Sequence, residues 1–459
     1  MSSADLASQW FANRRVGIVG LGREGLALAR FLLRTGASVI ATDDCPAEEL
    51  APEARDLERH GVTLYAGGLH EGVLAADCCF VSPGVPLDIP LIAGARAKGV
   101  HLWNEPGLFL SLCPSATVGV TGSSGKSTTA SLIAAIMRAD GRRTYLGGNI
   151  GLPLIERVGE MTPGDIAVLE LSSFQLDLAQ HSPDYALITN ITPNHLDRHY
   201  SMEAYIEAKA NVFLWQEPAD VVVLNAQDGY CKELAGRACG RVRWFSAGAA
   251  VEEGAFVRDG EVVLCDLKGS SAVCQVGEIR LLGRHNLANV LAASALSHSA
   301  GASVDAVRAA VTGFAGLRHR LELVAIVDQV AYYDDSIATT PERSMAAMRS
   351  LDSPLVLLAG GRDKHLPWDD WLAEVSARAK AVVVFGEIGG MLERILDGAG
   401  VAVERGGTML EAGDTARRLA EPGDVVLFSP GGTSFDEFKD FEERGDRFRE
   451  WVLAMGKRA

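Results

Sequence analysis

The stretch VGVTGSSGKSTTASLIAAI, residues 118–136, decides the fold of the central part of the chain. It predicts a β-strand, a glycine turn and then a helix that begins with Lys126, Ser127 and Thr128. Backbone N–H groups at such a helix start present several donors and a positive dipole end to an anion. Residues 122–128 are therefore a candidate polyphosphate loop, in which Lys126 reaches the β- and γ-phosphates and a hydroxyl binds Mg²⁺.

The loop departs from the strict pattern G-x-x-x-x-G-K-[ST], because Val120 stands where the first glycine is expected. The sequence reads T-G-S-S-G-K-S-T-T, so that Gly122 and Gly125 flank Ser123 and Ser124. The alternative is a structural glycine turn before an ordinary helix. A lysine directly after glycine, followed by three hydroxyl residues, favours a nucleotide site over that alternative.

A second glycine turn appears about a hundred residues earlier, in GIVGLGREGLALA. Gly20, Gly22 and Gly25 satisfy G-x-G-x-x-G between a predicted strand and a predicted helix, and Asp43 and Asp44 close the next predicted strand. This is the dinucleotide fingerprint. The pattern alone leaves three interpretations open: NAD or FAD, another nucleotide, or a purely structural turn.

A UDP-linked substrate satisfies the same physical requirements as a dinucleotide. The turn needs only a diphosphate at the helix N-terminus and a carboxylate for a ribose or base. Ser82, Pro83 and Gly84 follow a later predicted strand and are candidates to line the same crevice. The chain would then use one glycine turn for each of two phosphorylated ligands.

Short β-branched apolar runs alternate with helix-like segments along the whole chain, which predicts an α/β fold with parallel sheets. Residues 15–110 form a first expected unit, and the strand at 116–122 opens a second. Residues 242–282 are short β runs broken by Asp259-Gly260 and Gly269-Ser270, so a hairpin-rich insertion is expected. A third unit is expected to contain strands at the following positions: 323–335, 354–361, 381–386 and 424–432.

Composition limits the possible functions. The chain has 459 residues, which predicts two to four domains, and its net charge of −16 argues against a nucleic-acid surface. The eight cysteines show no C-x-x-C spacing and are expected to be free buried thiols in a reducing compartment. No run approaches 18 apolar residues, so we expect no membrane insertion and a cytoplasmic location.

Four residues of the second unit are candidates for metal binding or catalysis. Glu170 ends a predicted strand near the phosphate loop, as a Mg²⁺ ligand would, and His195 lies in the polar turn TPNHLDRH after another strand. The alternatives are a solvated strand-end carboxylate and a structural histidine. Lys209, on a predicted helix, is by itself more typical of a surface lysine, and Asn149 in GGNIG has no assigned role without the fold.

Taken together, these motifs resemble those of the Mur ligase family, and in particular its glutamate-adding member. ELSSFQLD and SFDEFKDFEERGDRF are specific to that member, whereas the phosphate loop is shared with other Mur ligases and with folylpolyglutamate synthases. The resemblance covers nearly the whole chain and runs through these segments: GLGREGLALA, VSPGV, TGSSGKSTT, GGNIG, ELSSFQLD, NITPNHLDRH, HNLANVLAA, GLRHRLE, DDSIATTP, GGRDK and SFDEFKDFEERGDRF.

The resemblance implies three α/β domains: a Rossmann-like UDP-substrate domain (1–112), a P-loop ATPase-type ATP domain with a small β insertion (113–317) and a Rossmann-like amino-acid domain (318–459). It implies a monomeric ligase that uses ATP and two Mg²⁺ ions to add glutamate, with the D-isomer favoured, to UDP-N-acetylmuramoyl-L-alanine through an acyl phosphate. This reaction belongs to peptidoglycan precursor synthesis. The rival interpretations are a folylpolyglutamate synthase-like ligase, an NAD-dependent oxidoreductase and a non-enzymatic nucleotide-binding regulator.

The resemblance also implies a role for each candidate residue. ATP would contact residues 122–128 together with Asn286, Asn289, Arg320 and Asp335, while Asn149 would help to place the acyl acceptor. The implied metal ligands are Ser127, Glu170, His195 and a carbamylated Lys209. UDP would contact Gly20, Gly22, Gly25, Asp43, Asp44, Ser82, Pro83 and Gly84, and glutamate would contact Thr339, Lys364, Ser434 and Phe441.

The sequence departs from the family pattern mainly in the third domain. The family usually has N-D-S-K-A-T where this chain reads DDSIAT, so Asp334 replaces asparagine and Ile337 replaces lysine. Gly431, Gly432 and Thr433 also stand where Ala-Cys-Ala is common. These positions surround the expected glutamate, so the resemblance leaves the choice between D- and L-glutamate open.

Overall fold

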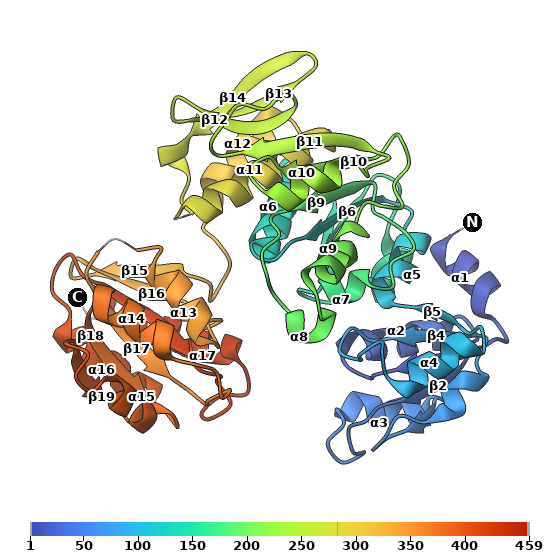
Figure 1. The fold of residues 1–459 in the computed structure, drawn as a ribbon, viewed down its shortest axis with the longest axis horizontal. Coiled ribbons are helices and arrows are strands. Elements are labelled where there is room, and N and C mark those ends of the chain that lie inside the picture. The colour runs from blue at the N-terminus through green and yellow to red at the C-terminus, as the bar shows by residue number, and fades with distance from the viewer. Residues whose placement is uncertain (1, 282, 352, 457–459) are drawn as a thin grey trace. The chain divides into compact units, whose positions relative to one another are not determined.

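The computed structural model describes residues 2–281, 283–351 and 353–456. The chain divides into two compact units (Figure 1). The first unit comprises Met1–Ile279 and Arg284–Phe314, and the second comprises Arg280–Gly283 and Ala315–Ala459. The first unit contains two sheets and the second contains one.

The N-terminal sheet is parallel, with strand order β3-β2-β1-β4-β5 among the described residues. In the sheet, β1 lies between β2 and β4, so the loops after β1 and β4 are adjacent at the point where the strand order reverses. Ligands of such sheets bind at this switch point. The elements are α1 (Ser3–Phe11), β1 (Arg15–Val19), α2 (Arg23–Arg34), β2 (Ser38–Thr42), α3 (Pro52–Arg59), β3 (Thr63–Tyr65), the 3₁₀ helix η1 (Glu71–Ala75), β4 (Cys78–Val81), α4 (Pro90–Ala97), β5 (His101–Trp103) and α5 (Glu105–Leu112).

The central sheet has the strand order β14-β13-β12-β11-β10-β9-β6-β8-β7. β6 lies between β8 and β9 and is parallel to both, so the segments that follow these three strands lie side by side at the carboxyl ends of the strands. Its elements begin with β6 (Ala116–Thr121), α6 (Lys126–Ala139), β7 (Thr144–Gly148), η2 (Leu154–Glu160), β8 (Ile166–Glu170), α7 (Ser173–Leu176), β9 (Tyr185–Ile188), α8 (Leu196–His199), α9 (Met202–Ala210), β10 (Val221–Asn225) and α10 (Gly229–Ala235).

The far edge of the central sheet is the expected hairpin-rich insertion. β12 pairs with β13, and β13 with β14, in antiparallel fashion, whereas the other pairs of this sheet are parallel. Asp259 and Gly260 both have positive φ, 52° and 79°, as a tight hairpin turn requires. The elements are β11 (Arg241–Ser246), β12 (Gly254–Arg258), β13 (Glu261–Asp266), β14 (Gly269–Gln275), η3 (Val276–Glu278), α11 (Arg284–Ser299) and α12 (Val304–Gly313).

The sheet of the second unit has the order β15-β16-β20-β17-β18-β19, and only its β15–β16 pair is antiparallel among the described residues. Its elements are β15 (Glu322–Val327), β16 (Val330–Asp334), α13 (Pro341–Met348), β17 (Leu355–Gly360), α14 (Asp369–Arg378), β18 (Ala379–Phe385), α15 (Gly389–Leu396), β19 (Ala402–Arg405), α16 (Met409–Leu419), β20 (Val425–Gly431) and α17 (Phe441–Gly456). The predicted α/β fold class with three sheets is confirmed, while the limits of the three domains stay predictions.

The prediction of one continuous strand over 323–335 is wrong. Asp328 and Gln329 have φ values of 52° and 63°, and they form the turn of a hairpin between β15 and β16. Two consecutive residues in the left-handed region reverse the chain with the twist that antiparallel strands favour. The apolar run is therefore two strands, and its second strand ends at Asp334.

Two general expectations about the chain can be compared with the structure. All eight cysteines lie within the described ranges and are free thiols, although Cys239 is exposed and Cys45, Cys78 and Cys113 are only half-buried. The expectation of uniformly buried thiols was wrong in these four cases. Within the described ranges, the helices lack the combination of length and apolar character that crossing a bilayer requires.

Two carboxyl groups are buried at the contact between the N-terminal and central sheets. Glu24 Oε1 accepts a hydrogen bond from Gln175 Nε2 (2.6 Å), and Glu105 Oε1 accepts one from the Ile155 N–H (3.0 Å). Burial raises the pKa of both carboxyls, and the neighbouring Glu24 raises that of Glu105 further. A carboxyl with a raised native pKa binds a proton where the unfolded chain does not, so it makes stability fall as pH increases.

We expect Glu105→Gln to flatten the pH dependence of stability between about pH 5 and about pH 8. The amide keeps the acceptor for the Ile155 N–H but carries no ionisable proton, so the variant should melt at a higher temperature than the wild type at the alkaline end. Melting curves followed by circular dichroism across this range measure the effect. Glu48→Gln, on an exposed loop, is the control. Parallel pH profiles for wild type and Glu105→Gln would contradict the expectation.

Candidate functional site

The phosphate loop connects β6 to α6 and is built around two glycines. Gly122 and Gly125 have φ values of 145° and 80°, in the region that favours glycine. A Cβ on Gly122 would lie 1.9 Å from Thr189 Oγ1, and one on Gly125 would lie 2.2 Å from Asn289 Oδ1. Asn289 also donates from Nδ2 to Asn286 Oδ1 (3.1 Å). Two asparagines that the sequence resemblance assigned to ATP are thus at the phosphate loop.

Two lysines converge on the same backbone carbonyl of this loop. Lys126 Nζ donates to the carbonyl oxygens of Gly122 (2.9 Å) and Ser123 (3.2 Å). Lys209 Nζ, from α9, donates to the Gly122 oxygen as well (2.8 Å). Both Nζ atoms therefore lie where the phosphates of a nucleotide would approach.

Lys209 is buried, with 1% of its surface exposed, so it is not the surface lysine that its isolated position on a helix suggested before the resemblance reversed that interpretation. Burial and the nearby charge of Lys126 lower its pKa well below the ordinary value. A lowered pKa leaves more of the amine neutral, and the neutral amine is the form that attacks carbon dioxide. The environment thus suits the carbamylation that the resemblance implies, which stays a prediction.

Glu170 ends β8 next to the phosphate loop, since it pairs with Val120 across the β6–β8 ladder. It is 2% exposed, so it is not a solvated strand-end residue. Its Oε1 accepts a hydrogen bond from Asn149 Nδ2 (2.7 Å), and Asn149 N–H donates to its carbonyl oxygen (2.8 Å). Its Oε2 is buried and has no hydrogen-bond partner among the described residues.

A buried carboxylate oxygen without a partner is costly, and a cation would satisfy it. Ser127 lies in the first turn of α6, at the phosphate loop, and is 8% exposed. Together with Glu170 it offers oxygen ligands of the kind that Mg²⁺ prefers, with the remaining positions left for phosphate oxygens and water. The residues present therefore fit a magnesium site.

The turn that contains His195 follows β9 on the other side of β6. Ser123 ties this segment to the phosphate loop: its N–H donates to Asn190 O (2.9 Å) and its hydroxyl to Thr192 O (2.9 Å). His195 itself has φ 54° and is exposed, and its ring lies edge-on to Phe174 with centroids 5.1 Å apart. The structure thus brings this turn beside the loop, and metal binding by His195 stays a prediction.

The first glycine turn follows β1 and is held by side chains of its own sheet. Ser82 Oγ donates to Gly20 O (2.7 Å), and Asp43 Oδ2 accepts from the Leu21 N–H (2.6 Å). Asp43 therefore braces the turn, whereas Asp44 is exposed. The structure brings the predicted UDP residues after β1, β2 and β4 to one end of the sheet, and Asp44 is the better placed of the two carboxylates for a ligand.

We expect Gly25→Ala to impair this turn severely. A Cβ at Gly25 would lie 2.0 Å from the Gly20 carbonyl oxygen, which is backbone and cannot move without shifting the turn. The affinity for UDP, measured by calorimetry, should fall by at least about tenfold, which is a loss of about 1.4 kcal/mol of binding free energy. Gly159→Ala, in the same compact unit, is the control, because this glycine is outside the positive-φ region and has no atom within 4 Å of the added carbon. UDP affinity equal to that of the wild type would contradict the expectation.

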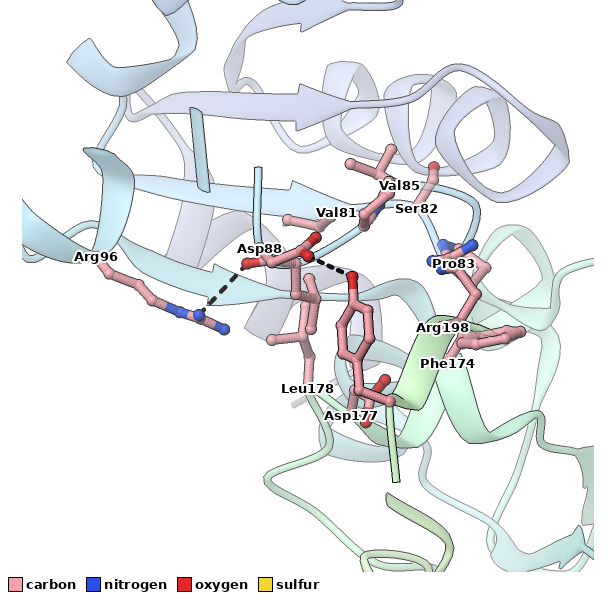
Figure 2. A pocket seen from close by; sticks show the side chains of 13 residues that line it. Val81, Ser82, Pro83, Val85, Asp88, Arg96, Phe174, Asp177, Leu178 and Arg198 are labelled. Atoms are coloured by element: carbon pink, nitrogen blue, oxygen red, sulfur yellow. Dashed lines mark hydrogen bonds between the residues drawn. The ribbon is translucent and has the colours of Figure 1, made fainter. Parts of the chain in front are cut away.

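A pocket of about 230 Å³ opens beside this turn, between the loop after β4 and the segments around α7 and α8 (Figure 2). Tyr200 Oη donates to Asp88 Oδ2 across it (2.6 Å), and Arg198 lies over the Phe174 ring at 4.6 Å. It is lined by Val81, Ser82, Pro83, Val85, Pro86, Leu87, Asp88, Arg96, Phe174, Asp177, Leu178, Arg198 and Tyr200. Ser82 and Pro83 are thus the predicted UDP residues that reach this pocket.

The second unit contains the residues predicted to bind glutamate. Lys364 Nζ donates to Thr339 Oγ1 (3.3 Å), so these two lie together. Ser434 is buried and Phe441 begins α17. Asp335, predicted at the nucleotide, accepts from Ser429 Oγ (2.8 Å), and burial raises its pKa to about 7.

The substitution of asparagine by Asp334 creates a buried pair. His319 Nδ1 lies 2.7 Å from Asp334 Oδ2, and both side chains are almost fully buried. Burial lowers the pKa of His319, but Asp334 and Asp446 raise it overall. His319 and Asp334 precede Arg320 and Asp335 in sequence, so the pair braces the backbone on which those two predicted ATP residues lie.

Arg444 is a residue that sequence reasoning missed. It is fully buried, and it donates from Nε to Ser336 Oγ (3.0 Å), from Nη2 to Ser336 O (2.8 Å) and from Nη1 to Gly432 O (3.1 Å). Ser336 Oγ donates in turn to Phe441 O (2.8 Å). Arg444 therefore joins three segments around the predicted glutamate residues. Arg444 stands in a run of acidic and basic residues, and this run offers no signal of its burial.

Three family models match the chain. "Mur ligase MurD-like, N-terminal domain" matches residues 14–104, "Mur ligase middle domain" matches 120–297 and "Mur ligase, glutamate ligase domain" matches 319–432. A protein of Symbiobacterium thermophilum named UDP-N-acetylmuramoylalanine–D-glutamate ligase is 44% identical over 96% of this chain and 98% of its own. A protein of Acetivibrio thermocellus with the same name is 37% identical over 96% and 97%.

Solved structures with lower identity share the fold. MurF from Acinetobacter baumannii has a TM-score of 0.61 at 17% identity, with 99% of this chain and 97% of its own covered. The UDP-N-acetylmuramate-alanine ligase of Thermotoga maritima has a TM-score of 0.59 at 20% identity, with 96% and 100% covered. With its three sheets, its two glycine turns and these full-length relatives, the chain belongs to the Mur ligase family.

Proposed function

We propose that the chain is an ATP-dependent ligase that joins D-glutamate to UDP-N-acetylmuramoyl-L-alanine and releases ADP and phosphate, as a step of peptidoglycan precursor synthesis. The observation that carries the proposal is the meeting of the phosphate loop, two lysines and the unpartnered Oε2 of Glu170 at one edge of the central sheet. Full-length relatives that are 36–44% identical and bear the D-glutamate ligase name support the choice of substrates.

An amide forms from a carboxylate and an amine only after activation. In the proposed reaction the substrate carboxylate attacks the γ-phosphorus of ATP, and ADP leaves. The glutamate amine then attacks the acyl carbon of the acyl phosphate, and phosphate is expelled. The protein contributes positioning and charge neutralisation rather than covalent chemistry.

Residues of the phosphate loop, together with Asn149 after β7, position the reactants and neutralise charge in these steps. Lys126, held against the Gly122 and Ser123 carbonyls, neutralises charge that develops on the transferred phosphoryl group. The backbone N–H groups at the start of α6 bind the phosphate oxygens. Asn149, fixed by its hydrogen bond to Glu170, orients the acyl acceptor.

Mg²⁺, when bound, supplies Lewis-acid stabilisation of the phosphate oxygens. We propose that Ser127 and Glu170 hold one ion, and that His195 and carbamylated Lys209 serve a second. Glutamate would contact Thr339, Lys364, Ser434 and Phe441. The enzyme is expected to act as a monomer in the cytoplasm, where ATP and UDP-linked precursors are available.

The test supplies purified protein with ATP, Mg²⁺ and UDP-N-acetylmuramoyl-L-alanine, together with D-glutamate or L-glutamate in separate reactions. Phosphate release is measured, and the product is identified by mass spectrometry. We expect release that requires both the UDP substrate and D-glutamate. Release with L-glutamate alone would correct the stereochemistry, whereas no release with either isomer would overturn the proposal.

A further inference from the structure

Two side chains in the first turn of α2, which packs in the N-terminal part of the first unit, form hydrogen bonds with segments that connect strands of the central sheet. Arg23, which lies inside the glycine turn, donates to three backbone carbonyls of the segment 148–151. Its Nη1 donates to Gly151 O (2.8 Å), and its Nη2 donates to Asn149 O (3.0 Å) and Gly148 O (3.3 Å). A guanidinium with a rigid fork of donors can hold several carbonyls in one arrangement.

Glu24, the next residue, binds a second segment of the central sheet. Its Oε1 accepts from Gln175 Nε2 (2.6 Å), and both side chains are buried. Gln175 Oε1 accepts in turn from Ser172 N–H (2.8 Å) and Ser172 Oγ (3.0 Å), which closes the N-terminal cap of α7. Glu24 thus secures the short turn that follows the end of β8.

These two segments flank the candidate metal ligand on both sides. Asn149 contacts Glu170 through its backbone N–H and its side chain, and Ser172 follows Glu170 by two residues. Gly148 and Gly151 have positive φ values of 91° and 63°, and a Cβ on Gly148 would lie 2.4 Å from Glu170 O. The segment 148–151 is therefore packed closely against Glu170, and its glycines give it little stiffness of its own.

We propose that Arg23 and Glu24 are positioning residues through which the first glycine turn fixes the orientation of Glu170, so that occupancy of that turn and binding of the Mg²⁺–nucleotide are coupled. The inference rests on the proposed function, which supplies the two ligands. A ligand in the glycine turn restrains the N-terminus of α2, and the same turn of helix holds both segments beside Glu170. Such couplings between sites are commonly about 5–150-fold in affinity.

The same helix offers a matched control. Arg30 lies two turns further along α2 and forms a two-pronged pair with Glu156, from Nε to Oε1 (2.9 Å) and from Nη2 to Oε2 (2.8 Å). It joins the same two sheets but touches neither segment beside Glu170. Arg30→Met therefore removes one arginine and its hydrogen bonds from the same helix, as Arg23→Met does, but leaves the segments beside Glu170 untouched.

The experiment measures by calorimetry the affinity of a non-hydrolysable ATP analogue with Mg²⁺, with and without saturating UDP-N-acetylmuramoyl-L-alanine. We expect the UDP substrate to tighten analogue binding at least about fivefold in the wild type. Arg23→Met and Glu24→Leu should reduce this enhancement to about onefold and raise the Mg²⁺ concentration needed for half-maximal turnover, whereas Arg30→Met should keep both wild-type values. Arg23→Lys and Glu24→Gln, which retain a donor and an acceptor, should recover part of the enhancement.

Several results would overturn the inference. It fails if the wild type turns over normally but shows no enhancement, if Arg23→Met keeps the full enhancement, or if Arg30→Met loses as much as Arg23→Met. Circular dichroism melting confirms that each variant is folded, and the conservative variants keep the test decisive if Glu24→Leu does not fold. Failure of the proposed function is distinct, because the wild type itself would then release no phosphate.

Discussion

Replacement of Lys126 by methionine is expected to lower kcat for ADP formation by roughly 10³-fold. The Nζ group is held 2.9 Å from Gly122 O and 3.2 Å from Ser123 O, so its charge is already in place before the nucleotide arrives. A preorganised charge of this kind stabilises the transferring phosphoryl group more than the ground state. Methionine keeps the length and packing of the side chain but removes the charge. A coupled assay for ADP release measures the effect.

The design of this experiment separates catalysis from folding and from substrate binding. Affinity for UDP-N-acetylmuramoyl-L-alanine, measured without nucleotide, should be unchanged, because Lys126 begins α6 after the phosphate loop and does not lie at the first glycine turn. Lys232→Met, an exposed lysine on α10, is the control and should leave turnover at the wild-type level. Turnover of Lys126→Met within a few-fold of the wild type would contradict the role given to the phosphate loop.

Lys209→Ala is expected to be nearly inactive and to regain activity when short carboxylic acids such as formate or acetate are added. The side chain is buried beside Lys126, and its lowered pKa favours the neutral amine that reacts with carbon dioxide. Alanine leaves a space in which a small carboxylate can replace the oxygens of the lost carbamate. Turnover of the variant is measured as a function of the concentration of added acid. Mass spectrometry of the wild type under mild conditions tests for a lysine that is about 44 Da heavier, the mass of the carbon dioxide that carbamylation adds.

The control for Lys209 distinguishes rescue from a general effect of the acids. Formate and acetate should not raise the activity of the wild type or of Lys126→Met, whose defect is a missing cation. Full activity of Lys209→Ala without any added acid would contradict carbamylation. An inactive variant that no carboxylate restores would limit Lys209 to the hydrogen bond that it donates to Gly122 O.

The phosphate loop could be predicted from sequence because its chemistry is local. A strand, two glycines, a lysine and three hydroxyl residues lie within residues 116–129, and in the structure they form β6, the glycine turn and the start of α6. The strand over 323–335 was predicted wrongly for an equally local reason. Asp328-Gln329 lacks the glycine that usually marks a tight hairpin, yet both residues adopt the left-handed conformation.

Long-range contacts account for what the sequence could not predict. In the sequence, Lys209 is one polar residue on a predicted helix. In the structure it is buried, and its Nζ donates to the Gly122 carbonyl oxygen, 87 residues earlier in the chain. Arg444 looks like a surface residue in a charged stretch, although it is buried against Ser336 and Gly432. No period or spacing within a helix carries this information, because it arises only when distant strands are brought to one edge of a sheet.

The hairpin at the far edge of the central sheet has a practical use. Leu267, at the turn between β13 and β14, is 87% exposed, and β14 is six strands away from β6 in the sheet order. β13 runs antiparallel to β12 and to β6, so its turn with β14 lies at the opposite end of the strands from the phosphate loop. Six spacings of about 4.8 Å across the sheet, with about 3.3 Å for each residue along a strand, place a dye there roughly 35 Å from the loop, a span suited to energy transfer from a fluorescent nucleotide. A Leu267→Cys, Cys239→Ser protein would direct labelling to that position, because Cys239 is the exposed thiol that would otherwise compete.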